Sequence, residues 1–331
     1  MTKLNISLAC TYTDRSAPIL DGRIAVSGCR INAMPGETQD IFRRVLNDQA
    51  FDVAEMSMSS HIVATARGNS AYVGIPIYLS RSFRHSSIYV RTDRGIDRPE
   101  DLAGRTIGVE QFQQTVALWV RGILRDRHGV ATEDVRWRSG GLEQPGGGER
   151  IALRLPAGID LQPIPAGNTL NGMLGSGEID AIVSPRVPSC FTKRSAPVDR
   201  LFPDYMQAEI EYFRATRIFP IMHVVVVRKS LVEEHPWLPA ELFRAFAKAK
   251  AQALNDLTLT NIPRVSLAWI NENAAQTRSV LGDKMWAYGF KESRAEVETM
   301  LRYAHADGLV AEPLEPEALF DPSTYGLADI P

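Results

Sequence analysis

Residues 177–184 carry the sequence Gly-Glu-Ile-Asp-Ala-Ile-Val-Ser, which predicts the end of a helix followed by a short buried strand. A second segment, residues 49–55, reads Gln-Ala-Phe-Asp-Val-Ala-Glu and shows the same order of a preceding helix, an aspartate and an apolar strand. A polar cluster accompanies the end of each strand, around Ser184 and around Glu55. The pattern therefore places polar side chains after two strands that are far apart in the sequence.

Short apolar runs alternate with helical patterns along the rest of the chain. Strands are predicted at 4–9, 51–54, 75–79, 87–90, 106–109, 135–138, 159–164, 178–183 and 221–227. Helices are predicted at 38–46, 60–68, 113–127, 169–175, 242–254, 267–281 and 293–307. This alternation is typical of an α/β fold in which helices cover both faces of a doubly wound sheet. The glycine-rich segment 140–148 has no Lys-Ser/Thr ending, so we interpret it as an exposed loop and not as a phosphate-binding loop.

The composition indicates a soluble globular protein that can bury a large core. The chain has 331 residues, 44% hydrophobic and 23% charged, with a formal net charge of −2, which favours two lobes or domains. The absence of a basic run argues against a nucleic-acid partner. Three scattered cysteines are too few for a disulfide framework or a zinc site. Segment 4–9 is too short for a secretory signal, and no membrane-spanning stretch is present, so we expect a cytoplasmic protein.

Residues 80–87, Ser-Arg-Ser-Phe-Arg-His-Ser-Ser, are the most chemically distinctive stretch. Arg81, Arg84 and His85 stand directly before an apolar strand, where buried positive charge is costly unless an anion is bound. A guanidinium matches the geometry of a carboxylate, and histidine titrates closest to neutral pH. We interpret the stretch as part of a site for an anion; the alternative is a solvated loop face.

The order of elements resembles the type II periplasmic-binding-protein fold, which has two lobes with doubly wound mixed sheets joined by two crossover strands. The resemblance implies one lobe of residues 1–90 plus 223–331 and a second lobe of residues 91–222. The crossings would lie at 87–90 and 223–227, and the ligand cleft between the lobes. Ligands of open α/β sheets bind beyond the carboxyl ends of the strands.

Five groups of residues resemble the 4,5-dihydroxyphthalate decarboxylase family, over most of 1–235. They are residues 80–90, 108–111 with 119–124, 137–141, 180–186 and 219–223. Members of this family are cytoplasmic relatives of solute-binding proteins that remove carbon dioxide from a dihydroxylated aromatic diacid. The resemblance implies a cofactor-independent carboxy-lyase of phthalate degradation, an aromatic decarboxylase that forms protocatechuate. Its partner would be a small aromatic dicarboxylate, and a homo-oligomer stays open.

Such a reaction needs a proton delivered to the ring carbon that bears the departing carboxylate. His85 and His223 are the candidate acid and base, with a packing or hinge role as the alternative for each. Glu110 follows strand 106–109, where its carboxyl could bind a phenolic hydroxyl, or could simply favour the start of a helix.

The remaining candidates would bind the substrate. Arg81 and Arg84 would anchor a carboxylate, and Arg186 would face them from the second lobe unless it forms a surface ion pair. Glu55 ends a strand, and the hydroxyl of Ser57 would help seat a carboxylate at the following helix or would only cap that helix. The last two candidates, for a hydrogen bond and for ring stacking, are Gln111 and Tyr12.

We expect no metal and no bound cofactor, although a divalent ion on Glu55, His85, Glu110 and His223 is not excluded. Three other functions remain open on this fold. The chain could be a solute-binding protein of an ABC uptake system for an aromatic acid, without catalysis. It could also resemble the cytoplasmic enzymes of menaquinone synthesis, or the thiamin-precursor group, whose Cys-rich motif is not found here.

Overall fold

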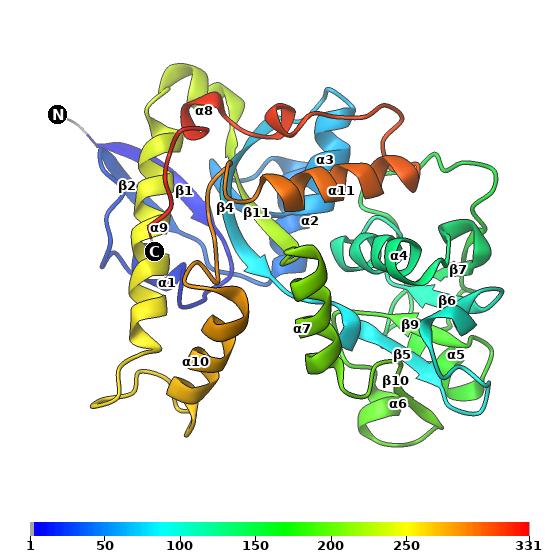
Figure 1. The fold of residues 1–331 in the computed structure, drawn as a ribbon. Coiled ribbons are helices and arrows are strands. Elements are labelled where there is room, and N and C mark those ends of the chain that lie inside the picture. The colour runs from blue at the N-terminus through cyan, green and yellow to red at the C-terminus, as the bar shows by residue number, and fades with distance from the viewer. Residues whose placement is uncertain (1–2, 331) are drawn as a thin grey trace.

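The computed structural model describes residues 3–330 and contains two sheets, each at the centre of one lobe (Figure 1). The first sheet has the order β2-β1-β3-β11-β4. Its strands are β1 (Leu4–Ala9), β2 (Cys29–Ala33), β3 (Val53–Ser57), β4 (Tyr72–Arg81) and β11 (Ile221–Arg228). Strand β1 is parallel to β2 and β3, whereas β11 is antiparallel to β3 and β4. The sheet is therefore mixed, as predicted.

The second sheet has the order β10-β5-β9-β6-β7-β8. Its strands are β5 (Ile88–Arg91), β6 (Thr106–Val109), β7 (Arg136–Ser139), β8 (Leu161–Pro163), β9 (Ala181–Val183) and β10 (Val198–Arg200). Strands β6, β7, β8 and β9 run parallel, and β5 is antiparallel to β9 and β10. Because β5 pairs within this sheet, residues 82–87 make the first passage between the lobes, and the second passage lies between β10 and β11.

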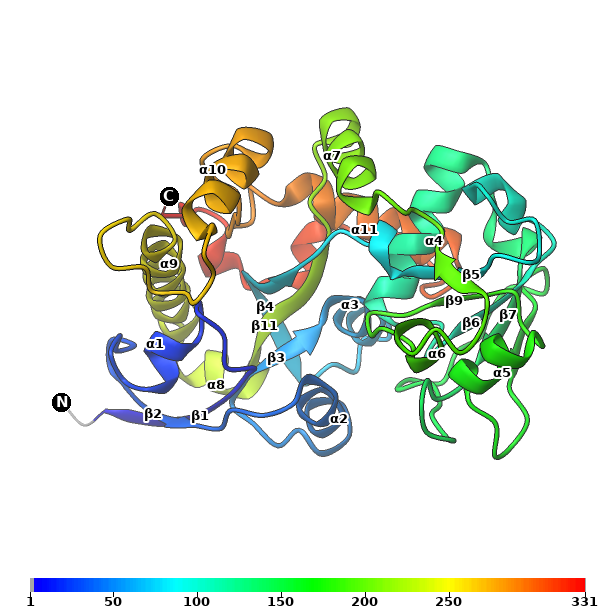
Figure 2. The same ribbon diagram turned by 90° about the horizontal axis from the view of Figure 1, so that it is seen from below.

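Helices surround both sheets (Figures 1 and 2). Those that follow strands of the first sheet, or belong to the C-terminal part, are α1 (Ala17–Leu20), α2 (Thr38–Asp48), α3 (Met58–Ala66), α8 (Lys229–Glu234), α9 (Leu238–Asp256), α10 (Ile270–Leu281) and α11 (Arg294–Ala306). Those of the second lobe and the return passage are α4 (Thr115–His128), α5 (Leu170–Ser176), α6 (Ser189–Thr192) and α7 (Tyr205–Thr216). None of the helices within residues 3–330 has both the length and the apolar character needed to cross a membrane.

Strand β11 shows why the sequence signal was strong at the centre of the first sheet. Its run of four valines is fully buried between β3 and β4, and β-branched side chains pack well on such a surface. The α/β, two-lobed expectation is confirmed. The division at residues 90 and 222 stays a prediction.

Helix α4 connects the second lobe to the rest of the molecule. Its residues from Thr115 to Leu124 are all buried. The indole of Trp119 donates a hydrogen bond of 2.8 Å to the Ile221 carbonyl at the start of β11, and its ring meets Tyr303 of α11 edge-on at 5.7 Å. Helix α11 lies between α3 and α4 (Figure 1), so α4 is held against elements of the first lobe along much of its length.

Candidate functional site at the contact between the lobes

The N-terminal ends of α3 and α4 meet between the two sheets (Figure 2). The hydroxyls of Ser57 and Thr115 lie 2.9 Å apart, and the Ser59 N–H lies 3.3 Å from the same Thr115 oxygen. The Ser59 hydroxyl donates to the Gln113 carbonyl, which brings a third residue to this contact. All four residues are buried. This edge carries the carboxyl ends of β3 and β6, the region where open α/β sheets bind ligands.

Beside this contact, the buried carboxylate of Glu55 is hydrogen-bonded to His223, which is partly exposed. Their strands are antiparallel neighbours, and the Glu55 Oε1 atom lies 2.6 Å from Nδ1 of His223. The second carboxylate oxygen accepts a hydrogen bond of 2.8 Å from the Thr11 N–H. Burial alone would raise the pKa of Glu55, but the contacts with His223 and Thr11 outweigh it and lower that pKa. The carboxylate therefore holds the proton of His223 on Nδ1 and leaves Nε2 free for a reacting group.

A second carboxylate lies at the end of β6. Glu110 pairs with the Arg186 guanidinium and accepts a hydrogen bond of 3.3 Å from the Ser184 hydroxyl. The Arg186 side chain is 61% exposed, so this ion pair is open to solvent on one side. Gln111 donates a hydrogen bond of 2.6 Å to the Gly148 carbonyl. The structure thus brings Glu110 and Arg186 together beyond the carboxyl end of β6, with Gln111 next to Glu110 in the chain.

Arg84 lies in the first passage between the lobes. Its Nε atom contacts the Met222 sulfur at 3.0 Å, one residue before His223. Burial lowers the pKa of Arg84 to about 10, and nearby Glu209 opposes this shift only in part. Within residues 3–330, no carboxylate oxygen lies within 4.0 Å of its guanidinium, because Glu209 instead accepts the Ser86 N–H. A desolvated cation without a counter-ion is suited to bind an anionic ligand.

Arg81 has a different environment from Arg84. Its guanidinium pairs with Glu296 at 3.0 Å and donates to the carbonyls of Phe219 and Ala287 and to the Ser293 hydroxyl. Glu296 neutralises the charge of Arg81, and these contacts hold β4 against the C-terminal part of the chain. We therefore do not include Arg81 in the proposed site. Tyr12 is 60% exposed, so its ring lies largely in solvent.

His85 is packed against the return passage rather than against Glu55 and His223. Its ring meets Phe202 at 5.1 Å and Tyr212 of α7 at 5.3 Å. Burial, with a small contribution from His128, lowers the pKa of His85 to about 4. The imidazole is thus neutral at pH 7 and contributes to packing, so we do not assign it a proton transfer.

The stability of the protein should fall between pH 6.5 and pH 4. Burial lowers the pKa of His61 and of His85 to about 4, so in this range the unfolded chain binds protons that the folded chain does not. Near pH 4, each of the two histidines then lowers the unfolding free energy by up to about 3 kcal/mol. Urea unfolding at pH 7.5 and 4.5 should show a smaller pH effect for His85→Phe than for the wild type. Equal pH effects in the two proteins would contradict this expectation.

The structure adds residues that the sequence did not indicate. The loop after β7 carries Glu149, whose carboxylate accepts the N–H groups of Phe112 (2.5 Å) and Gln113 (3.1 Å) just before α4. The next residue, Arg150, reaches the first lobe. One feature of the sequence could have pointed to them: an acidic and a basic residue directly follow the three glycines 146–148. Among residues 3–330, no three His, Cys, Asp or Glu side chains gather as a metal site. A metal-free reaction stays a prediction.

Comparison with known proteins identifies the family. A protein named 4,5-dihydroxyphthalate decarboxylase from Comamonas testosteroni is 41% identical over 324 residues, covering 98% of both chains. The chain belongs to the 4,5-dihydroxyphthalate decarboxylase family. A second protein of that name, from Pseudomonas putida, is 42% identical over 65% of this chain and 83% of its own. No family model matches the chain.

Solved structures support the fold of this decarboxylase family member. The periplasmic aliphatic sulphonate binding protein SsuA from Escherichia coli superposes with a TM-score of 0.52 at 13% identity, covering 100% of this chain and 94% of its own. The desulfurization enzyme DSZB superposes with a TM-score of 0.51 at 13% identity, covering 97% of each chain. At these identities the likeness concerns the fold alone. It confirms the periplasmic-binding-protein-like architecture and shows that an enzyme also uses this fold.

Proposed function

We propose that this protein is a carboxy-lyase that converts 4,5-dihydroxyphthalate to protocatechuate and carbon dioxide. The family membership gives the reaction class. The observation that carries the assignment of a site is the hydrogen bond between the buried Glu55 carboxylate and Nδ1 of His223, which leaves the other imidazole nitrogen available beside the contact between the lobes. The His223 side chain is 21% exposed, so a small ligand can reach it.

The reaction replaces a ring carboxylate by a proton. A hydroxyl para to the departing carboxylate donates electron density, so the ring carbon that bears this carboxylate can accept a proton from an acid. The resulting dienone then loses the carbon–carbon bond to the carboxylate, whose electron pair returns to the ring, and carbon dioxide leaves. One proton is consumed for each carbon dioxide released, and no electron is exchanged with a cofactor.

His223 is the proton donor in this proposal. Its Nε2–H delivers the proton to the ring carbon, and the charged Glu55 stabilises the imidazolium form before transfer and orients the ring. Phe42 meets the imidazole edge-on at 4.9 Å and limits its rotation. Glu55 therefore acts through His223, as a positioning residue.

The substrate is a dianion that must be held with its hydroxyls toward a hydrogen-bond acceptor. Arg84 supplies positive charge from the passage between the lobes. Glu110, kept in place by Arg186 and Ser184, accepts the proton of the phenolic hydroxyl as the dienone forms and returns it to the phenolate oxygen when carbon dioxide leaves. Ser57, at the contact between α3 and α4, and Gln111, next to Glu110 in the chain, complete the polar surroundings in this proposal.

The test is a product assay on protein treated with a chelator. We expect stoichiometric carbon dioxide and protocatechuate from 4,5-dihydroxyphthalate, at the same rate before and after treatment with EDTA and dialysis. Loss of activity that Mg²⁺, Mn²⁺ or Zn²⁺ restores would contradict the metal-free mechanism. Tight binding of 4,5-dihydroxyphthalate without any product would contradict the decarboxylase assignment and support a solute-binding protein.

A further inference from the structure

A loop of the second lobe, residues 148–152, crosses to the first lobe beside the site. On its own side, the carbonyls of Gly148 and Ile151 accept hydrogen bonds of 2.6 Å from Gln111 and 2.8 Å from Gln113. On the other side, Arg67 at the end of α3 donates to the Ala152 carbonyl. The backbone of the loop is thus fastened at both ends, and it presents the side chain of residue 150 at a fixed place.

The Arg150 guanidinium lies among neutral groups of the first lobe. It donates to the Gln39 side chain at 2.5 Å and to the Ser60 hydroxyl at 3.4 Å. Its central carbon lies 5.3 Å from the centre of the Phe42 ring. Within residues 3–330, no carboxylate oxygen lies within 4.0 Å of it, and burial lowers the pKa of Arg150 to about 10 despite the more distant Glu149 and Glu110.

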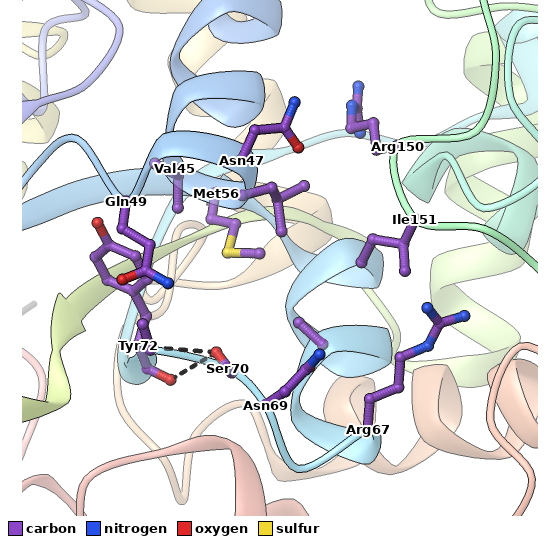
Figure 3. A pocket seen from close by; sticks show the side chains of 13 residues that line it. Val45, Asn47, Gln49, Met56, Arg67, Asn69, Ser70, Tyr72, Arg150 and Ile151 are labelled. Atoms are coloured by element: carbon purple, nitrogen blue, oxygen red, sulfur yellow. Dashed lines mark hydrogen bonds between the residues drawn. The ribbon is translucent and has the colours of Figure 1, made fainter.

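The position of Arg150 relates it to the proposed proton donor. Both groups lie against the Phe42 ring, whose centre is 5.3 Å from the central carbon of the Arg150 guanidinium and 4.9 Å from the centre of the His223 ring. Figure 3 shows Arg150 at the rim of a cavity of about 290 Å³ between α2 and α3, with its guanidinium turned away from Met56 and Tyr72. Arg67 is near the same rim, but its hydrogen bond goes to the loop backbone.

We propose that Arg150 binds the carboxylate that the aromatic substrate keeps, and so holds the ring with its other carboxylate toward His223. This inference rests on the proposed function. An arginine bound to the departing carboxylate would stabilise the substrate more than the transition state, because that charge is lost as carbon dioxide forms. An arginine on the retained carboxylate stabilises both states and orients the ring. A carboxylate is a stronger acceptor for Arg150 than its present amide and hydroxyl partners.

Binding measurements on two arginine variants test this role without requiring turnover. Arg150→Gln removes the charge, and Arg67→Gln is the matched control that removes the other arginine contacting the loop. Isothermal titration calorimetry would measure the binding of three ligands. Protocatechuate has one carboxylate, the methyl ester of protocatechuate has no carboxylate, and phthalate has two. We expect Arg150→Gln to raise the dissociation constants of protocatechuate and phthalate about 10- to 100-fold. This is the effect of losing a hydrogen bond to a charged group. The methyl ester should change less than threefold.

The outcomes separate this inference from the proposed function. An unchanged dissociation constant for protocatechuate in Arg150→Gln would overturn the inference, as would an equal loss in Arg67→Gln, which would reveal a role in fastening the loop. An equal loss for the methyl ester would also overturn it. If the wild type releases no carbon dioxide from 4,5-dihydroxyphthalate but still binds phthalate through Arg150, the proposed function fails and the carboxylate site remains.

Discussion

Replacing His223 with glutamine is expected to lower kcat for decarboxylation by about 10²–10⁴-fold, the usual contribution of a placed proton donor. Glutamine can retain a hydrogen bond to Glu55 and fits the space beside Phe42, but it cannot deliver a proton to the ring carbon. Because His223 acts on the ring carbon and not on the charged groups of the substrate, KM should change by less than fivefold. The measurement is the rate of protocatechuate formation under saturating substrate.

Two further variants distinguish catalysis from folding. Glu55→Gln should lower kcat about 10- to 100-fold with KM unchanged, because the imidazolium loses its stabilising charge while the hydrogen-bond geometry is kept. His235→Gln changes a histidine far from the site, beside Trp237, and should keep wild-type rates. A His223→Gln enzyme with kcat within threefold of the wild type would show that another group protonates the ring.

The strongest strand predictions fall on strands that are deeply buried. Strands β3 and β11 are almost completely buried, and their apolar runs were visible without a structure. Strand β2 was missed because it is the edge strand of its sheet and alternates polar and apolar side chains, Cys-Arg-Ile-Asn-Ala. Strand β10 has three residues, two of them charged, and pairs only at the sheet edge. Edge strands carry little of the hydrophobic pattern that makes central strands recognisable.

The sequence named several residues of the candidate site but could not show which of them contact one another. Glu55 and His223 were each named as candidates, but their 2.6 Å contact joins residues 168 positions apart and depends on strand pairing. Arg81 and Arg84 looked equivalent in one short motif. The structure separates them, because Arg81 meets an internal glutamate while Arg84 meets only a thioether. Local sequence shows that a charge is present; only the tertiary fold decides whether a protein carboxylate neutralises it.

Arg150 was not named as a candidate from the sequence, although the structure places it beside the site. The glycine-rich loop was interpreted as solvent-exposed, and residues 143–148 are indeed exposed. The charged pair that follows is half-buried, since Glu149 binds N–H groups before α4 and Arg150 reaches α2 and α3. A glycine-rich loop followed by two charged residues shows no hydrophobic periodicity, so the sequence does not reveal that these two residues are held in place. The role of Arg150 can be inferred only from the residues that its side chain contacts in the folded protein.

The largest effect on stability is expected for Asp307→Asn, at about 3–5 kcal/mol of unfolding free energy. Asp307 follows α11 and is fully buried with Arg121 of α4, at 2.6 Å between Oδ2 and Nε. Its other oxygen accepts from Arg125 at 2.5 Å and from Thr132 at 2.7 Å. The substitution keeps the size of the side chain but leaves the buried Arg121 guanidinium without its counter-ion. That loss is far costlier than the loss of a surface pair.

A surface pair between the same two helices provides the control. Asp126 and Arg302 are 29% and 55% exposed and lie 2.6 Å apart, so Asp126→Asn should cost at most about 1 kcal/mol. Urea unfolding at pH 7 of the two variants measures the difference directly. Burial would raise the pKa of Asp307, but Arg121 and Arg125 outweigh it and lower that pKa, so the pair stabilises the fold above the unfolded pKa near 4. This stabilisation is lost as the pH falls through the lower folded pKa. Equal losses for Asp307→Asn and Asp126→Asn would show that the α4–α11 contact is held by apolar packing, such as Trp119 on Tyr303, and not by the buried ion pair.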